Sequence, residues 1–300
     1  MMSSVKLICV LDGGGMRGFY EMDVLRTIIQ HNRNGQLKFD LAVGVSAGGI
    51  VAAFLALGKF NDEKFDVATF YSLTREIFKV RNKNGPLFRP KYDGTPKKQI
   101  LRKFFGDARL GDVSTHLAIV CATLDGGIVN LCSWKKEHKS LLLADVLDAT
   151  TAAPFYFPPV KLMDIWLTDG GIRANKPLIQ AFLFSRELFS KNSDFRFLSI
   201  GTFFRSKYRF EGDRQASFMG VWGWLKQGIL QVFMGTQDET QEELFELLFG
   251  DNFLRLVCTC DDIVLDDQTP TVPEILQESA LHSFLNNKQK LKRLLNLEFD

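Results

Sequence analysis

The sequence predicts an α/β fold in which a parallel sheet is covered by helices on both faces. Its first apolar segment, residues 5–11, is followed by a glycine loop and then by apolar residues at helical spacing over residues 19–29. The same order returns at once, with an apolar strand at residues 39–43, a turn of small residues and an apolar helix over residues 50–57. Two strand–loop–helix units within about fifty residues are typical of parallel strands whose crossover helices cover the sheet.

The later elements extend this pattern through the 300 residues of the chain. Periodicity predicts helices over residues 62–79, 141–151, 177–189 and 271–295, a hairpin of residues 117–123 and 128–134, and strands at residues 195–201 and 253–259. Residues 218–249 are rich in helical pattern. Because no linker or repeat interrupts the chain, we expect a single domain over residues 1–300, with residues 206–300 packed on residues 5–205.

One segment departs from this regular pattern. Residues 79–103 carry nine Lys or Arg against the single acid Asp93, and glycines and prolines interrupt them. We expect a solvated loop here. The alternative is a basic loop that contacts an anionic substrate or a lipid surface.

Composition and motif content narrow the classes of protein to consider. The net charge of +2 argues neither for nor against a nucleic-acid or membrane partner, but Lys and Arg are scattered without a recognisable nucleic-acid-binding module, so we expect no nucleic-acid partner. No apolar run reaches the roughly 18 residues of a transmembrane helix, and no signal peptide is recognisable. The five cysteines are typical of free thiols in a reducing compartment. We therefore expect a cytoplasmic protein that meets membranes only peripherally, and the sequence does not determine its oligomeric state.

Residues 44–48 read Gly-Val-Ser-Ala-Gly between the second strand and its helix. In a G-x-S-x-G turn, small residues such as Gly44 and Gly48 allow the sharp bend, and the serine is raised above the sheet next to a helix N-terminus. We therefore predict that Ser46 is a nucleophile.

The loop after the first strand has two interpretations. Gly13, Gly15 and Gly18 form G-x-G-x-x-G, which on its own indicates a dinucleotide site, but the acid that should end the second strand is missing there. In the alternative, the N–H groups of Gly13, Gly14 and Gly15 converge at a helix N-terminus and stabilise an oxyanion. A nucleophile turn in the next unit favours the oxyanion site.

A serine nucleophile needs a base, and two candidates are open. His282 is the histidine that follows an acid near position 169, but its amphipathic surroundings are typical of a surface or packing residue. Asp169 lies in Leu-Thr-Asp-Gly-Gly after an apolar stretch, as expected of a residue at a strand end. An aspartate is a weak base in water, yet it can act when held against Ser46 in a desolvated site. No cysteine or histidine cluster with metal-ligand spacing is present, so we expect no metal and no cofactor.

Together the three motifs resemble the patatin-like phospholipase family. Its D-G-G-G-x-R-G, G-x-S-x-G and D-G-[GA] patterns are matched in order by residues 12–18, 44–48 and 169–171, the last ending at Gly171. Residues 152–159, 169–177 and 198–202 are similar to further family stretches, with Lys176 and Phe203 as departures that affect neither the nucleophile nor the base.

The resemblance implies a three-layer α/β/α fold with a mostly parallel central sheet, and lipid acyl hydrolysis through an acyl-enzyme on Ser46. It implies Asp169 as proton acceptor, and an oxyanion site formed by residues 13–15 with help from Arg17. Apolar residues at 218–234 could then form an interfacial helix, although such a stripe more often packs on the core. A catalytically silent lipid-binding or interaction module, and a dinucleotide-binding protein, remain the alternatives.

Overall fold

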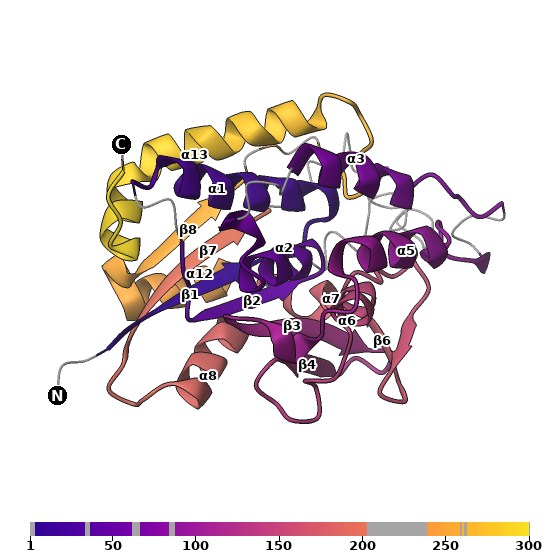
Figure 1. Cartoon of the computed structure of the whole chain (residues 1–300), viewed down its shortest axis with the longest axis horizontal. Helices are drawn as coiled ribbons and strands as arrows, with labels where there is room; N and C mark the ends of the chain where they lie inside the picture. Colours follow the sequence, from indigo (N-terminus) through magenta and orange to yellow (C-terminus); the bar gives the residue numbers. More distant parts are fainter. Residues whose placement is uncertain are drawn as a thin grey trace, which may run out of the picture.

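The computed structural model describes residues 4–33, 37–61, 67–83, 88–202, 239–258, 260 and 263–299. A central sheet of eight strands lies between layers of helices (Figure 1). This arrangement confirms the predicted α/β fold.

Five neighbouring strands of the sheet run parallel to one another. Their spatial order is β3 (His116–Thr123), β2 (Leu41–Val45), β1 (Val5–Leu11), β7 (Asp194–Gly201) and β8 (Phe253–Val257). Three antiparallel strands extend the sheet beside β3, namely β4 (Ile128–Cys132), β5 (Val160–Leu162) and β6 (Ile165–Asp169). The predicted hairpin is the β3–β4 pair, whereas the β5–β6 hairpin was not predicted.

Alternate residues of each central strand face opposite helical layers. On β1, Cys9 and Leu11 pack into one core cluster, while Ile8 and Val10 pack into the other. The first cluster is covered by α1 (Gly18–His31), α2 (Ala47–Ala56), α3 (Val67–Ile77), α5 (Gly94–Phe105), α6 (Leu143–Thr150) and α13 (Val272–Leu295). The second is covered by α7 (Gly171–Ala174), α8 (Leu178–Leu188) and α12 (Glu239–Phe249). Both faces of the sheet are therefore buried, which explains the continuous apolar runs of the central strands.

The prediction of a solvated loop over residues 79–103 is wrong in its second half. Residues 94–105 form α5, whose N-cap Asp93 accepts a hydrogen bond from the N–H of Thr95 at 2.8 Å. Pro96 lies in the first turn, where a helix tolerates a proline because the N–H groups there have no partner within the helix. Lys97 is buried on this helix.

Some predictions fall outside the described part of the chain. These are the apolar stripe at 218–234, residues 62–66 of the expected helix, and Phe203. Most predicted boundaries differ from the structure by a few residues; for example, β2 begins at Leu41 rather than at residue 39, and β8 ends at Val257, before Cys258 and Cys260. Within the described residues, none of the helices combines the length and the apolar character that a membrane span requires.

The register of β3 determines which elements meet at the C-terminal end of β2. Val45, the last residue of β2, pairs with Val120, and Asp169, the last residue of β6, pairs with Cys121. β4 pairs with residues 118–122 of β3 and occupies one edge of that strand. On the opposite edge, β2 pairs with residues 116–120 and β6 with residues 121–123, so the two strands meet end to end.

Candidate active site

Ser46 occupies a strained turn between β2 and α2. Its backbone angles are φ 53° and ψ −124°, a combination that residues with a side chain rarely adopt. Such strain persists only where the surroundings hold the backbone in place, and it is a feature of nucleophile turns. The turn predicted from residues 44–48 thus has the backbone geometry expected of it.

The two glycines of this turn are required by close backbone contacts. A Cβ atom on Gly44 would lie 2.3 Å from the carbonyl oxygen of Gly48, and one on Gly48 would lie 2.3 Å from the carbonyl oxygen of Asp12. The N–H of Gly48 donates to that same Asp12 oxygen at 3.0 Å. The serine turn is therefore fastened to the start of the glycine loop.

The structure brings Asp169 against Ser46. The Ser46 hydroxyl donates a hydrogen bond of 2.6 Å to Asp169 Oδ2, and both side chains are buried, with 7% and 1% of their residue surface exposed. The N–H of Gly171 donates to Asp169 Oδ1 at 2.8 Å, which fixes the orientation of the carboxyl group. As predicted, Asp169 ends a strand.

Burial changes the acidity of this carboxyl group. It raises the pKa of Asp169 from 3.8 to about 6, although the hydrogen bonds from Ser46 and Gly171 and the charge of Lys97 oppose the change. A carboxylate whose pKa lies nearer neutrality is a better general base than one in water. Asp169 is thus able to take a proton from the hydroxyl to which it is bonded.

The Thr150 side chain forms hydrogen bonds with the serine turn and with β3. Its Oγ1 accepts a hydrogen bond from the N–H of Ser46 at 2.9 Å and donates one of 2.5 Å to the carbonyl oxygen of Val120. Thr150 is fully buried at the end of α6. Its hydroxyl thus ties the strained residue to α6 and to β3.

The glycine loop lies beside Ser46, but its amides are not equivalent. Gly13 lies closest, since a Cβ atom there would be 3.4 Å from Ser46 Cβ. Its N–H already donates to the carbonyl oxygen of Asn175 at 3.0 Å. Within the described residues, the N–H groups of Gly14 and Gly15 have no such partner. Gly15 also lines the same pocket as Ser46, so its amide is better placed than that of Gly13 to receive an oxyanion.

Arg17 was predicted to help form the oxyanion site. It is buried next to residues that line the pocket, but it is not itself among them. Its participation stays a prediction.

The first residue of the glycine loop belongs to a largely buried ion-pair network that the sequence did not reveal. Asp12 receives two hydrogen bonds from the guanidinium of Arg255 on β8, one of them 3.0 Å long. Arg255 also donates to Glu242 on α12 at 3.1 Å, and Glu242 pairs with Lys176. Burial raises the pKa of Asp12 and Arg255 opposes this, so the cation favours the charged carboxylate. The C-terminal part of the chain thereby holds the glycine loop in place.

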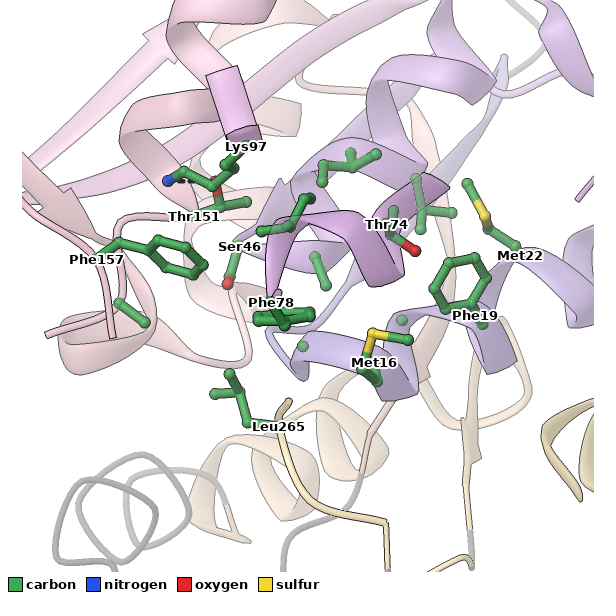
Figure 2. A pocket seen from close by; sticks show the side chains of 17 residues that line it. Met16, Phe19, Met22, Ser46, Thr74, Phe78, Lys97, Thr151, Phe157 and Leu265 are labelled. Carbon is green, nitrogen blue, oxygen red and sulfur yellow. Dashed lines mark hydrogen bonds between the residues drawn. The ribbon is translucent and has the colours of Figure 1, made fainter. Parts of the chain in front are cut away.

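An apolar pocket adjoins Ser46 (Figure 2). Ser46 lies near its middle, with Lys97 and Phe157 on one side and Phe19 and Met22 on the other. The remaining lining residues are Gly15, Met16, Gly18, Ala47, Ile50, Val51, Thr74, Ile77, Phe78, Thr151, Ala153 and Leu265. A largely apolar wall beside a nucleophile suits an alkyl chain.

Among the described residues that line this pocket, Lys97 alone is charged, and sequence reasoning did not single it out. Its Nζ lies 4.6 Å from the centre of the Phe157 ring and 3.1 Å from Asp148 Oδ1. In the sequence, Lys97 lies three and four positions before Ile100 and Leu101, which is the spacing of residues on one helix face. The surrounding basic residues made the segment read as a solvated loop, so this spacing was not used.

The histidines take no part in this arrangement. Of the residues that the structure describes, no histidine lines the pocket that contains Ser46. His282 is exposed on α13 and contacts Asn286. Of the two candidate bases, the structure places Asp169 at the serine.

Comparisons with known proteins are consistent with this geometry. A family model described as Patatin-like phospholipase matches residues 9–182. A cGAMP-activated phospholipase of Escherichia coli (strain TW11681) is 27% identical over 96% of this chain and 88% of its own length. Patatin-like protein 4 of Arabidopsis thaliana is 27% identical over 87% of this chain and 78% of its own length. The crystal structure of VipD from Legionella pneumophila shares the fold, with a TM-score of 0.55 at 14% identity over 97% of this chain and 67% of that protein.

Proposed function

The chain belongs to the patatin-like phospholipase family, and we propose that it hydrolyses fatty-acyl esters of phospholipids or related lipids through a Ser46–Asp169 dyad. The observation that carries the proposal is the 2.6 Å hydrogen bond from the Ser46 hydroxyl to a buried carboxyl group. The apolar pocket beside Ser46 supports an acyl chain as the group that is bound.

In the first half of the reaction, Ser46 Oγ attacks the ester carbonyl carbon while Asp169 Oδ2 takes the hydroxyl proton. The carbonyl oxygen becomes an oxyanion, which the N–H groups of Gly14 and Gly15 stabilise. The intermediate then expels the alcohol part of the lipid, which leaves with the proton from Asp169. An acyl group remains bound to Ser46.

In the second half, Asp169 takes a proton from a water molecule, and the resulting hydroxide attacks the acyl-enzyme. The bond to Ser46 Oγ breaks, the serine recovers its proton from Asp169, and a fatty acid is released. The chain's own residues supply both proton transfers, because the same carboxyl group acts as base and then as acid.

Two alternative functions make different predictions. A dinucleotide-binding protein would use the glycine loop, but β2 ends in the serine turn rather than in an acid that could bind a ribose. A silent lipid-binding or interaction module would keep the fold without turnover. The close contact of Ser46 with Asp169 favours turnover over both.

The test measures fatty-acid release from phosphatidylcholine and phosphatidylglycerol vesicles, together with labelling by a fluorophosphonate probe. Ser46→Ala is expected to lose both, and Asp169→Asn to lose at least about 10⁴-fold in turnover. The matched controls are Ser114→Ala and Asp164→Asn, which alter exposed residues of the same types. Each reaction is run with and without cGAMP, because three of the similar proteins are named for that activator. Equal release by wild type and Ser46→Ala under both conditions would refute the proposal.

A further inference from the structure

Lys97 is a buried cation, 3% exposed, in the first turn of α5. Its Nζ donates to the carbonyl oxygen of Asp148 at 2.8 Å and to Thr151 Oγ1 at 3.1 Å, and it lies 3.1 Å from Asp148 Oδ1. These acceptors match the three N–H donors of an ammonium group. All of them lie at the C-terminal end of α6, where the helix dipole favours a positive charge.

The residues that follow Asp148 hold both members of the proposed dyad. Thr150 Oγ1 accepts the N–H of Ser46 at 2.9 Å, and the carbonyl oxygen of Ala152 accepts the N–H of Asp169 at 3.1 Å. Residues 148–152 therefore connect the serine turn with the end of β6. Any shift of this segment changes the distance between nucleophile and base.

We propose that Lys97 is a positioning residue for the dyad. Its ammonium group fixes residues 148–152, and through them it fixes Ser46 relative to Asp169. The inference rests on the proposed function, because it concerns the same site. A displacement of reacting groups by about 1 Å can lower turnover about 10²-fold, so a residue that prevents it has a measurable effect.

The positive charge of Lys97 also reaches Asp169. Among the described residues, the ionisable groups around that carboxyl are Lys97 from α5, Asp148 from α6 behind it, and the Cys121 thiol opposite it on β3. The Lys97 charge lowers the pKa of Asp169, in opposition to burial, while burial raises the pKa of Cys121 and keeps it a neutral thiol. A positioning role by a charged group should therefore be visible in the pH profile.

The experiment compares three variants in the hydrolysis of a soluble p-nitrophenyl ester between pH 4.5 and 9. Lys97→Met is expected to lower kcat about 10²-fold with little change in KM, and to move the acid-side midpoint upward from about 6. Asp148→Asn keeps the backbone acceptor of Lys97 but removes its counter-charge, so the midpoint is expected to move downward. Lys98→Met is the control, since Lys98 pairs at 3.4 Å with Asp145 at the surface and should leave kcat and the midpoint unchanged.

Opposite midpoint shifts in Lys97→Met and Asp148→Asn support the proposal. The proposal is overturned if Lys97→Met changes neither kcat nor the midpoint. It is also overturned if the midpoints of Lys97→Met and Asp148→Asn move in the same direction, by amounts that parallel the loss of thermal stability in each variant. If circular dichroism shows that Lys97→Met does not fold, Asp148→Asn decides alone, and any result except a downward shift overturns the proposal. If only the positioning proposal is wrong, Lys97→Met behaves like wild type and the wild type still shows Ser46-dependent hydrolysis. If the wild type shows no such hydrolysis, both the proposed function and the positioning proposal are overturned.

Discussion

Asp169→Asn is expected to abolish hydrolysis and, at the same time, to stabilise the folded protein at neutral pH. The carboxyl group is buried, and its folded-state pKa is raised from 3.8 to about 6. A raised pKa means that the folded state binds the proton more tightly than the unfolded state does. The stability contributed by this group is therefore fully present below about 3.8 and is lost as the pH rises through about 6.

The pKa difference corresponds to about 3 kcal/mol of unfolding free energy at pH 8. Asparagine carries no charge and avoids this loss, while its Oδ1 can still accept the N–H of Gly171. The weakened contact with Ser46 subtracts about 1 kcal/mol at every pH. The stabilisation relative to wild type should thus be about 2 kcal/mol at pH 8 and smaller by about 1 kcal/mol at pH 5.

Urea unfolding of both proteins at pH 5 and pH 8 measures this difference. Asp164→Asn is the control, because that carboxyl group is exposed and the substitution should change the free energy of unfolding little at either pH. If Asp169→Asn changes stability by the same amount at both pH values, burial does not raise the pKa of Asp169 and the argument for its basicity fails.

Two further substitutions test the supports of the site. Thr150→Val leaves the N–H of Ser46 and a β3 carbonyl without their partner, so we expect a loss of about 2–4 kcal/mol in urea unfolding and a lower kcat. Thr115→Val is the control: it removes another buried hydroxyl hydrogen bond and should lower stability without lowering kcat. Equal losses of kcat in both variants would contradict a specific role of Thr150 in holding the serine turn. Arg255→Met leaves Asp12 buried without its cation and is expected to cost about 3–5 kcal/mol. An unfolding curve identical to that of wild type would show that the pair contributes nothing.

The parts of the site that the residue pattern alone predicts most directly are those built by neighbouring residues, whereas the pairing of Asp169 with Ser46 is one of two open alternatives until the family resemblance implies it. Gly44 and Gly48 surround Ser46 at fixed spacing because the turn itself excludes side chains there, and that constraint is visible in the sequence. Strand and helix patterns on either side predict the βα unit. The fold class follows from the repetition of such units.

The parts that could not be predicted depend on contacts between distant segments. Arg255 reaches Asp12 across 243 positions of sequence, and an arginine on an edge-side strand has no local signature of burial. Lys97 lies among basic residues that are mostly solvated, and the acceptors at the end of α6 make its burial favourable. A charge pattern alone does not separate one buried cation from its exposed neighbours.

The meeting of Ser46 with Asp169 follows from the way two strands share one edge of β3. The backbone at Ser46 turns away with φ 53°, so β2 stops pairing after Val45 and the edge of β3 beyond Val120 is left open. β6 occupies that edge in the antiparallel direction, running back towards the end of β2. Only an antiparallel strand brings its C-terminal residue to this point, since a parallel strand would begin there. The antiparallel β6 is therefore the feature that converts a serine turn on a parallel sheet into a serine–aspartate pair.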